Sequence, residues 1–182
     1  MISMKKIVVL VGPSGSGKTS LANALSSKGF YKPVTCTTRC KRHNEKNGID
    51  YFFISEEEFI NKKYNQELVD YDYVFGTWYG VERAEFQKND SNIVMPATFK
   101  GVSNLKSHFD NVRSVFLNPP NENVLMERMR ERMMCEKLIN DRILNIRDEM
   151  RNMEKCDYVI STDQDLDASC TDLERILCLK NF

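Results

Sequence analysis

The chain has 182 residues, of which 41% are hydrophobic and 29% charged, and this composition suits one compact soluble domain. Its 26 basic residues balance its 26 acidic ones, whereas proteins that wrap a polynucleotide usually carry a basic excess, so we expect no nucleic-acid partner. The longest early apolar run, Ile7 to Val11, is too short to cross a bilayer, and no signal-peptide pattern precedes it. We therefore expect a cytoplasmic protein with no membrane partner, either a monomer or a homodimer.

Strands and helices are expected to alternate along the chain. The elements predicted in the first half are a buried parallel strand at 6–11, a helix at 18–27, short strands at 33–36 and 51–54, a helix opened by the capping box of Ser55 and Glu58, a strand pair or hairpin at 67–75 and a helix at 81–88. Those in the second half are strands at 92–97, 112–117 and 158–161, with helices at 101–109, 121–133, 138–153 and 166–179. This alternation predicts an α/β fold with a parallel sheet.

The clearest motif lies between the first strand and the first helix. Residues 12–19 read GPSGSGKT and match the pattern G-x-x-x-x-G-K-[ST] of a phosphate-binding loop, or P-loop. Small residues let backbone N–H groups surround a phosphate, Lys18 neutralises phosphate charge, and the Thr19 hydroxyl is a ligand for Mg²⁺. We therefore predict binding of ATP with Mg²⁺ by Gly12, Pro13, Ser14, Gly15, Ser16, Gly17, Lys18, Thr19 and Ser20.

A second cluster follows, with the order T-T-R-x-x-R-x-x-E-x-x-G-x-D-Y-x-F over residues 37–53. With the P-loop, the Trp78-Tyr79-Gly80 turn and the strand 157–160, it resembles the guanylate kinase family over nearly the whole chain. The resemblance implies a P-loop three-layer fold with three parts. These are a core (1–33, 80–120 and 154–182), a small strand-rich NMP-binding subdomain (34–79) and a helical lid (121–153).

The same resemblance assigns roles to individual residues. Arg39, Arg42, Tyr51 and Tyr79 would hold the phosphate of a nucleoside monophosphate acceptor, a group that arginine grips bidentately. Three lid arginines would lie over the transferring phosphoryl group: Arg128, Arg132 and Arg142. With Lys18 and Arg39 they complete the expected catalytic set, because phosphoryl transfer depends mainly on positioning and charge.

The part of the site that would bind the acceptor base departs from the family pattern. Thr35 supplies a hydroxyl, and Asp70 replaces the usual glutamate. Val81 stands where the family has a hydroxyl, and Pro96 and Thr98 stand where a strand normally ends in Asp-x-Asp. A lost carboxylate contact to guanine costs about 1–3 kcal/mol of selectivity.

Several functions therefore remain open. The first is ATP-dependent phosphorylation of GMP or dGMP, with Thr35, Asp70, Val81 and Thr98 around the base. The second is a kinase of another nucleotide or of a ribose phosphate. A non-catalytic binding module and a simple NTPase switch are the third and fourth.

Overall fold

The structure is a computed structural model that describes residues 5–74, 76–88, 90–131 and 136–178. Its elements are, in chain order, β1 (Ile7–Val11), α1 (Lys18–Ser26), β2 (Cys36–Thr37), β3 (Phe52–Phe53), α2 (Glu56–Tyr64), β4 (Leu68–Val74), β5 (Thr77–Glu82), the 3₁₀ helix η1 (Arg83–Gln87), β6 (Ile93–Pro96), α3 (Phe99–Lys106), β7 (Val112–Asn118), α4 (Glu122–Glu131), α5 (Glu136–Met150), the 3₁₀ helix η2 (Met153–Lys155), β8 (Tyr158–Ser161) and α6 (Leu166–Cys178). Within these ranges, no helix has the length and apolarity needed to span a membrane.

A four-stranded parallel sheet forms the centre of the molecule, in the order β6-β1-β7-β8. Every residue of β1 is buried. Because side chains alternate between the faces of a strand, the odd-numbered residues of β1 join one apolar cluster and the even-numbered residues another. Burial on both faces explains why this strand is a continuous apolar run rather than an alternating one.

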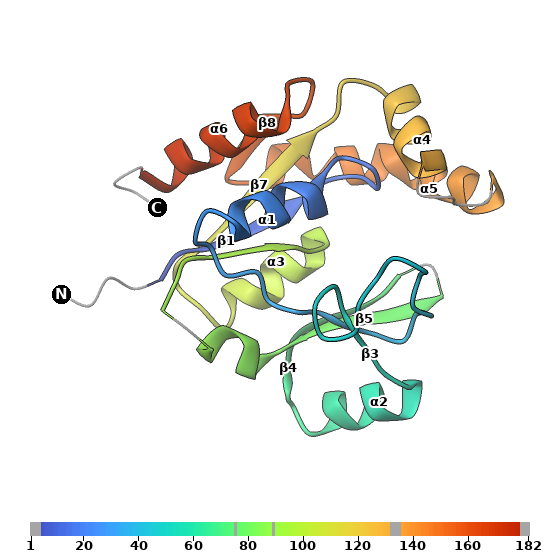
Figure 1. Ribbon diagram of the computed structural model, residues 1–182, viewed down its shortest axis with the longest axis vertical. Helices are drawn as coiled ribbons and strands as arrows, with labels where there is room; N and C mark the ends of the chain where they lie inside the picture. The colour runs from blue at the N-terminus through green and yellow to red at the C-terminus, as the bar shows by residue number, and fades with distance from the viewer. Residues whose placement is uncertain (1–4, 75, 89, 132–135, 179–182) are drawn as a thin grey trace.

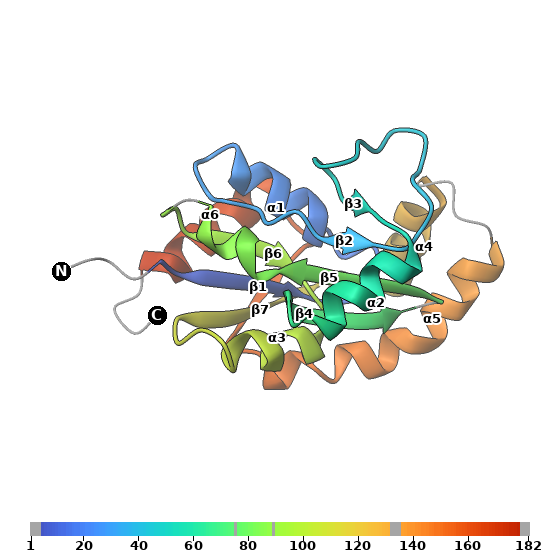
Figure 2. The same ribbon diagram turned by 90° about the horizontal axis from the view of Figure 1, so that it is seen from below.

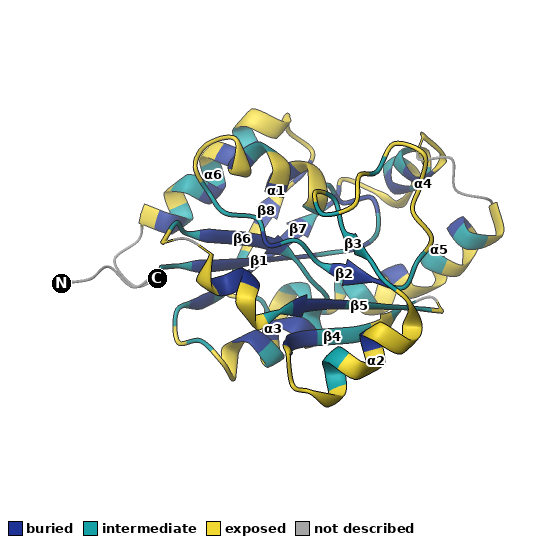
Figure 3. Cartoon of the chain, turned by 60° about the horizontal axis from the view of Figure 1, so that its bottom comes forward, coloured by how far each residue is buried: buried dark blue, intermediate teal, exposed yellow. Residues whose placement is uncertain are grey.

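Helices cover both faces of the central sheet. Leu25 of α1 and Leu173 of α6 are fully buried against one face, and Leu105 of α3 is buried against the other (Figure 1). Figure 3 shows the buried residues concentrated in the strands, with exposed residues on the outer sides of the helices. The fold is therefore the predicted three-layer α/β arrangement around a parallel sheet.

A second, smaller sheet has the order β3-β2-β5-β4. Its longest pair is the antiparallel hairpin of β4 and β5, in which Gly76 adopts a φ of 80° that favours glycine. Figure 2 shows α2 lying over β4 and β5, and Phe59 of this helix is fully buried beside Cys36 and Leu68. The Ser55 side chain caps α2 by accepting from the Glu58 amide at 3.0 Å, as the capping box predicts.

The helices α4 and α5 pack against each other through a small apolar cluster of their own. It consists of Leu125, Met129, Ile139 and Ile146, all buried. These two helices follow β7 and return the chain to β8, the strand at one edge of the central sheet. Their placement puts charged side chains from both helices near the end of β1.

Several predicted elements have different bounds, among them the helix expected at 138–153, which is Glu136–Met150. The helix expected at 81–88 is wrong, because Val81 and Glu82 pair with β4 and only Arg83–Gln87 turns, as a 3₁₀ helix. Pairing with a distant strand overrides the local helical pattern here. The helix expected at 101–109 is Phe99–Lys106, because the Thr98 side chain caps it by accepting from the Gly101 amide at 3.3 Å. The strand expected at 33–36 is Cys36–Thr37.

Candidate active site

The loop after β1 has a backbone that only glycine fits well. Gly12 and Gly17 have φ values of 143° and 96°, and a Cβ on Gly12 would lie 2.8 Å from the backbone oxygen of Leu117. Gly17 precedes α1, and no described side chain caps this helix by a hydrogen bond to its first turn. The orphan N–H groups of that turn are therefore available to an anion, with the helix dipole in its favour.

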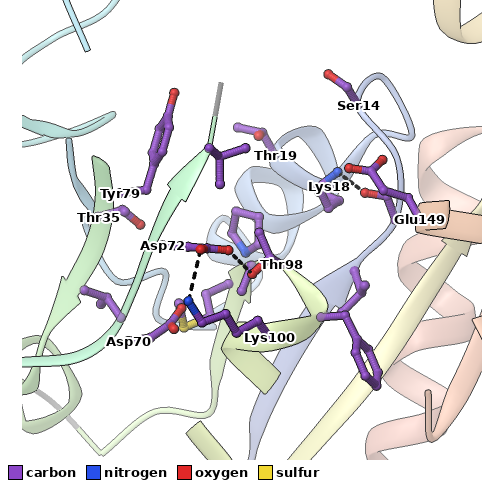
Figure 4. A pocket seen from close by; sticks show the side chains of 18 of the residues that line it. Ser14, Lys18, Thr19, Thr35, Asp70, Asp72, Tyr79, Thr98, Lys100 and Glu149 are labelled. Carbon is purple, nitrogen blue, oxygen red and sulfur yellow. Dashed lines mark hydrogen bonds and ion pairs between the residues drawn. The ribbon is translucent and has the colours of Figure 1, made fainter. Parts of the chain in front are cut away.

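A cavity of about 560 Å³ lies between this loop and the small sheet. Figure 4 places Lys18 and Thr19 on one side of it and Tyr79 and Thr35 on the other. The predicted site residues that line it are Gly12, Ser14, Gly15, Gly17, Lys18, Thr19, Thr35, Arg39, Arg42, Tyr51, Asp70, Tyr79, Val81, Thr98 and Arg142. Tertiary folding thus brings both predicted phosphate-binding clusters to one space.

The four residues predicted to hold the acceptor phosphate, here called the acceptor clamp, are Arg39, Arg42, Tyr51 and Tyr79. The Arg39 guanidinium donates to Glu45 Oε1 at 2.7 Å and lies 5.4 Å from the ring centre of Tyr51. The Arg42 amide donates to the other Glu45 oxygen at 2.8 Å. Burial by itself raises the pKa of the Glu45 carboxyl, but these bonds hold that pKa below its ordinary value. Glu45 therefore stays charged, and because its Oε1 also pairs with the Arg42 guanidinium at 3.6 Å, it orients both arginine side chains.

Asp70 lies on the cavity wall near the start of β4, opposite Val81 in the hairpin. Its side chain is largely buried, and burial raises the pKa of its carboxyl, an effect that a 2.8 Å hydrogen bond from Asn104 Nδ2 partly offsets. Val81 brings no hydroxyl to this wall. Asn104, on α3, holds Asp70 in place, and no sequence motif pointed to it.

Gly101 leaves room for Asp70, because a Cβ at this position would lie 2.5 Å from Asp70 Oδ2. We expect Gly101→Ala to displace that carboxylate and raise the KM for the acceptor about tenfold, since one charge-assisted contact is worth about 1.5 kcal/mol or more. The KM for ATP should not change. Steady-state kinetics checks this, with Ser103→Ala on the exposed side of α3 as the control. An unchanged acceptor KM in Gly101→Ala would contradict the role given to Asp70.

Sequence reasoning missed Asp72 and Lys100, which also line the cavity. Asp72 Oδ2 accepts from Thr98 Oγ1 at 3.1 Å, and Asp72 Oδ1 accepts from Lys100 Nζ at 3.2 Å (Figure 4). The sequence does give one indication of Asp72. It is two residues after Asp70 on the same strand, so both side chains point to the same face of the sheet. Nothing local links either acid to Lys100.

Two of the three predicted lid arginines reach the P-loop. Arg142 Nη1 donates to Ser14 Oγ, and Arg128 Nη1 donates to the Gly15 backbone oxygen at 3.2 Å. The third, Arg132, lies outside the described residues. The loop therefore receives positive charge from α4 and from α5.

Glu149, at the end of α5, lies beside Lys18 in the cavity (Figure 4). Burial raises the pKa of its carboxyl, and the charges of Lys18 and Arg142 oppose that rise. Lys18 Nζ also donates to the backbone oxygens of Gly12 at 2.5 Å and Pro13 at 2.9 Å. The lysine is thus held over the loop before any ligand arrives.

A second cavity, of about 530 Å³, also borders the P-loop and shares Gly15 and Gly17 with the first. The remaining described residues that line it are Ser16, Ser20, Leu21, Leu117, Arg128, Glu131, Thr162, Gln164, Leu166 and Ser169. Of the three predicted loop residues that the first cavity lacks, Ser16 and Ser20 line this second cavity. Pro13 lines neither cavity and contacts Lys18 through its backbone oxygen.

The side-chain oxygens beside the P-loop suit a Mg²⁺ ion that is held mainly by the phosphates of a bound nucleotide. Mg²⁺ prefers oxygen ligands and usually keeps waters and substrate phosphates among them. Thr19 brings a hydroxyl to the cavity beside Lys18, whereas Pro96 and Ala97, at the end of β6 next to β1, bring no side-chain oxygen. These residues fit Mg²⁺ that takes one protein ligand and completes its shell from phosphate oxygens and water.

Comparison with known proteins gives a consistent result. A family profile described as guanylate kinase matches residues 4–179. The chain is 34% identical to a guanylate kinase of Anaplasma phagocytophilum (strain HZ), covering 96% of this chain and 87% of the relative. It is 32% identical to a guanylate kinase of Legionella pneumophila (strain Paris), covering 94% and 84%. The crystal structure of guanylate kinase from Anaplasma phagocytophilum superposes with a TM-score of 0.77 at 30% identity, covering 96% and 85%.

Proposed function

Because the chain belongs to the guanylate kinase family, we propose that it transfers the γ-phosphoryl group of ATP to GMP or dGMP, giving ADP and the nucleoside diphosphate. It is a nucleoside monophosphate kinase, a phosphotransferase. The observation that carries the proposal is the cavity shared by Lys18 and the acceptor clamp. In-line transfer needs donor and acceptor phosphates to face each other in this way.

In this proposal ATP binds with its phosphates in the P-loop. Backbone N–H groups and the start of α1 hold the β-phosphate, and Lys18 releases its carbonyl contacts to bind the β- and γ-phosphates. The second cavity, on the far side of the loop, takes the adenosine part. When bound, Mg²⁺ neutralises phosphate charge, and Thr19 would be its protein ligand.

The acceptor phosphate binds to the acceptor clamp, with Glu45 keeping Arg39 and Arg42 oriented. The base lies deeper, between Thr35, Asp70, Val81 and Thr98. We assign residues 34–79, which hold most of the small sheet, to an NMP-binding subdomain, and the helices α4 and α5 to a lid (121–153). The rest, including the last residues of β5, belongs to the core. Closure of the two parts over the ligands excludes water, which otherwise competes as the acceptor.

The chain's residues act on the transfer through charge rather than through a covalent intermediate. Arg142 and Arg128, already at the loop, and Arg132 stabilise the charge that spreads over the transferring phosphoryl group. Glu149 holds Lys18 and Arg142 by its charge. We further propose a cytoplasmic location and a monomer or homodimer.

The test is a coupled ADP-release assay of the purified protein against the common nucleoside monophosphates, their deoxy forms and ribose bisphosphates. We expect turnover with GMP and dGMP, and little ADP release without an acceptor. Turnover of another acceptor with none of any guanine nucleotide would overturn the proposal. The changes at Val81, Pro96 and Thr98 favour that second candidate, a kinase of another nucleotide or of a ribose phosphate.

Thermal denaturation with Mg-ATP and the same ADP-release assay separate a binding module and an NTPase switch from a kinase. A non-catalytic module shows no thermal stabilisation by Mg-ATP, whereas an enzyme that binds ATP gains stability from it. A switch hydrolyses ATP at a rate that does not depend on any acceptor.

A further inference from the structure

One wall of the cavity carries two charged residues, Asp72 and Lys100, that have no part in the phosphate binding proposed above. Asp72 and Lys100 form an ion pair there, at 3.2 Å, and Thr98 donates to the other Asp72 oxygen. Asp72 is opposite Tyr79 in the hairpin, two residue pairs along from Asp70 and Val81, so both acids lie on the same face of β4. The two acids therefore lie side by side, next to the tyrosine end of the acceptor clamp.

Stability does not account for this pair. The Lys100 side chain is 61% exposed, and ion pairs at exposed sites contribute about 0–1 kcal/mol. Lys100 also occupies the first turn of α3, where the helix dipole disfavours a positive charge. A weak ion pair inside a ligand cavity separates easily when a ligand offers each residue a stronger hydrogen-bond partner.

Three groups on this wall thus present a defined pattern to a ligand. Asp70 and Asp72 only accept hydrogen bonds when charged, and Lys100 only donates. Their complement is an edge with two N–H donors next to one acceptor. Guanine has that edge in its 2-amino group, N1–H and O6, whereas adenine has one amino donor beside a ring nitrogen that accepts.

We propose that Asp72 and Lys100 are specificity-determining residues that read N1–H and O6 of the acceptor base, while Asp70 reads its 2-amino group. Asp72 and Lys100 are already in contact, so they suit adjacent atoms of the base, and Asp70 is the next acceptor along the strand. Thr98 stands at a position where the family pattern has an aspartate. Asp72 accepts a hydrogen bond from Thr98 and thereby supplies a carboxylate close to that position. This inference rests on the proposed function, because it assumes a guanine acceptor.

The test measures kcat/KM of wild type, Asp72→Asn and Asp70→Asn with GMP, IMP and AMP. IMP lacks only the 2-amino group, and AMP presents the reversed donor and acceptor. We expect Asp72→Asn to lower kcat/KM for GMP and IMP in parallel, by roughly 10- to 100-fold, with AMP use unchanged or raised. Asp70→Asn should lower GMP use and leave IMP use within about threefold.

A second variant and a control complete the experiment. Lys100→Met removes the donor to O6 and should also lower GMP and IMP use without lowering AMP use. Glu67→Gln changes an exposed acid that precedes the same strand and pairs with Lys62 at 3.4 Å, and it should leave all three values unchanged. Thermal denaturation of each variant checks that the fold is kept.

The outcomes separate the two claims. A wild type that does not use GMP overturns the proposed function and this inference together. A wild type that uses GMP, with a GMP-to-AMP preference that Asp72→Asn leaves unchanged, overturns the inference alone. Loss of GMP use but not IMP use in Asp72→Asn also overturns the assignment of Asp72 to N1–H.

Discussion

Lys18→Ala is expected to lower kcat by at least roughly 10²- to 10³-fold, the cost of removing one preorganised group from charge that develops in a transition state. The ammonium group sits over the loop, bonded to the Gly12 and Pro13 backbone oxygens, where phosphate oxygens would bind. Alanine favours a helix at the first position of α1, so the fold should persist. Acceptor-dependent ADP release measures the effect, and circular dichroism confirms the fold.

The matched control is Lys28→Ala, beyond the end of α1. Lys28 pairs with Glu174 at 3.0 Å, and both side chains are 41% exposed, so its loss should change stability little and leave kcat unaltered. Mg-ATP should raise the melting temperature of the control more than that of Lys18→Ala. A Lys18→Ala enzyme with kcat within tenfold of wild type would remove this lysine from the transfer step.

Arg39→Ala is the other change with a large expected effect, a fall of roughly 10²- to 10³-fold in kcat/KM for the acceptor. Loss of one charge-assisted contact accounts for about 1.5–3 kcal/mol. The substitution also leaves Glu45, whose side chain is only 15% exposed, with less positive charge beside an incoming phosphate. The KM for ATP should stay the same, because Arg39 contacts the acceptor side of the cavity.

A double variant separates the two parts of this loss. Arg39→Ala combined with Glu45→Ala removes the uncompensated carboxylate, so it should recover part of the activity that Arg39→Ala loses. Arg175→Ala, which breaks an exposed pair with Asp172 on α6, is the control and should change neither KM. An acceptor KM that Arg39→Ala leaves unaltered would show that the acceptor phosphate binds elsewhere.

The sequence was sufficient to predict a structural feature wherever one continuous segment of the chain forms that feature. The strand, the loop and the helix of the P-loop occupy residues 7–26 without interruption, and the motif predicts each in its place. β8 also has its predicted bounds, Tyr158–Ser161. The positions of the acceptor clamp followed from the spacing of one family pattern, although their roles stay predictions.

The differences between the predicted and the observed elements come from pairing between segments that are far apart in the sequence. Val81 and Glu82 belong to β5 because β4 lies beside them, and no helical propensity competes with a completed hairpin. In the same way, Asp72 and Lys100 are 28 residues apart and meet only because α3 packs beside β4. The period-two alternation of a strand is enough to put Asp72 on the same face as Asp70, but it gives no sign of what that face meets.

The grouping of Asp70, Asp72 and Lys100 on one wall of the cavity is thus a property of the assembled fold. The phosphate-binding loop can be predicted from sequence, because its backbone amides, its lysine and its threonine lie in one short segment and need only a tight turn to act together. The wall instead needs the hairpin and the first turn of α3 to approach within hydrogen-bond distance. Contacts of that kind depend on how apolar faces pack, and short-range patterns do not encode which faces meet.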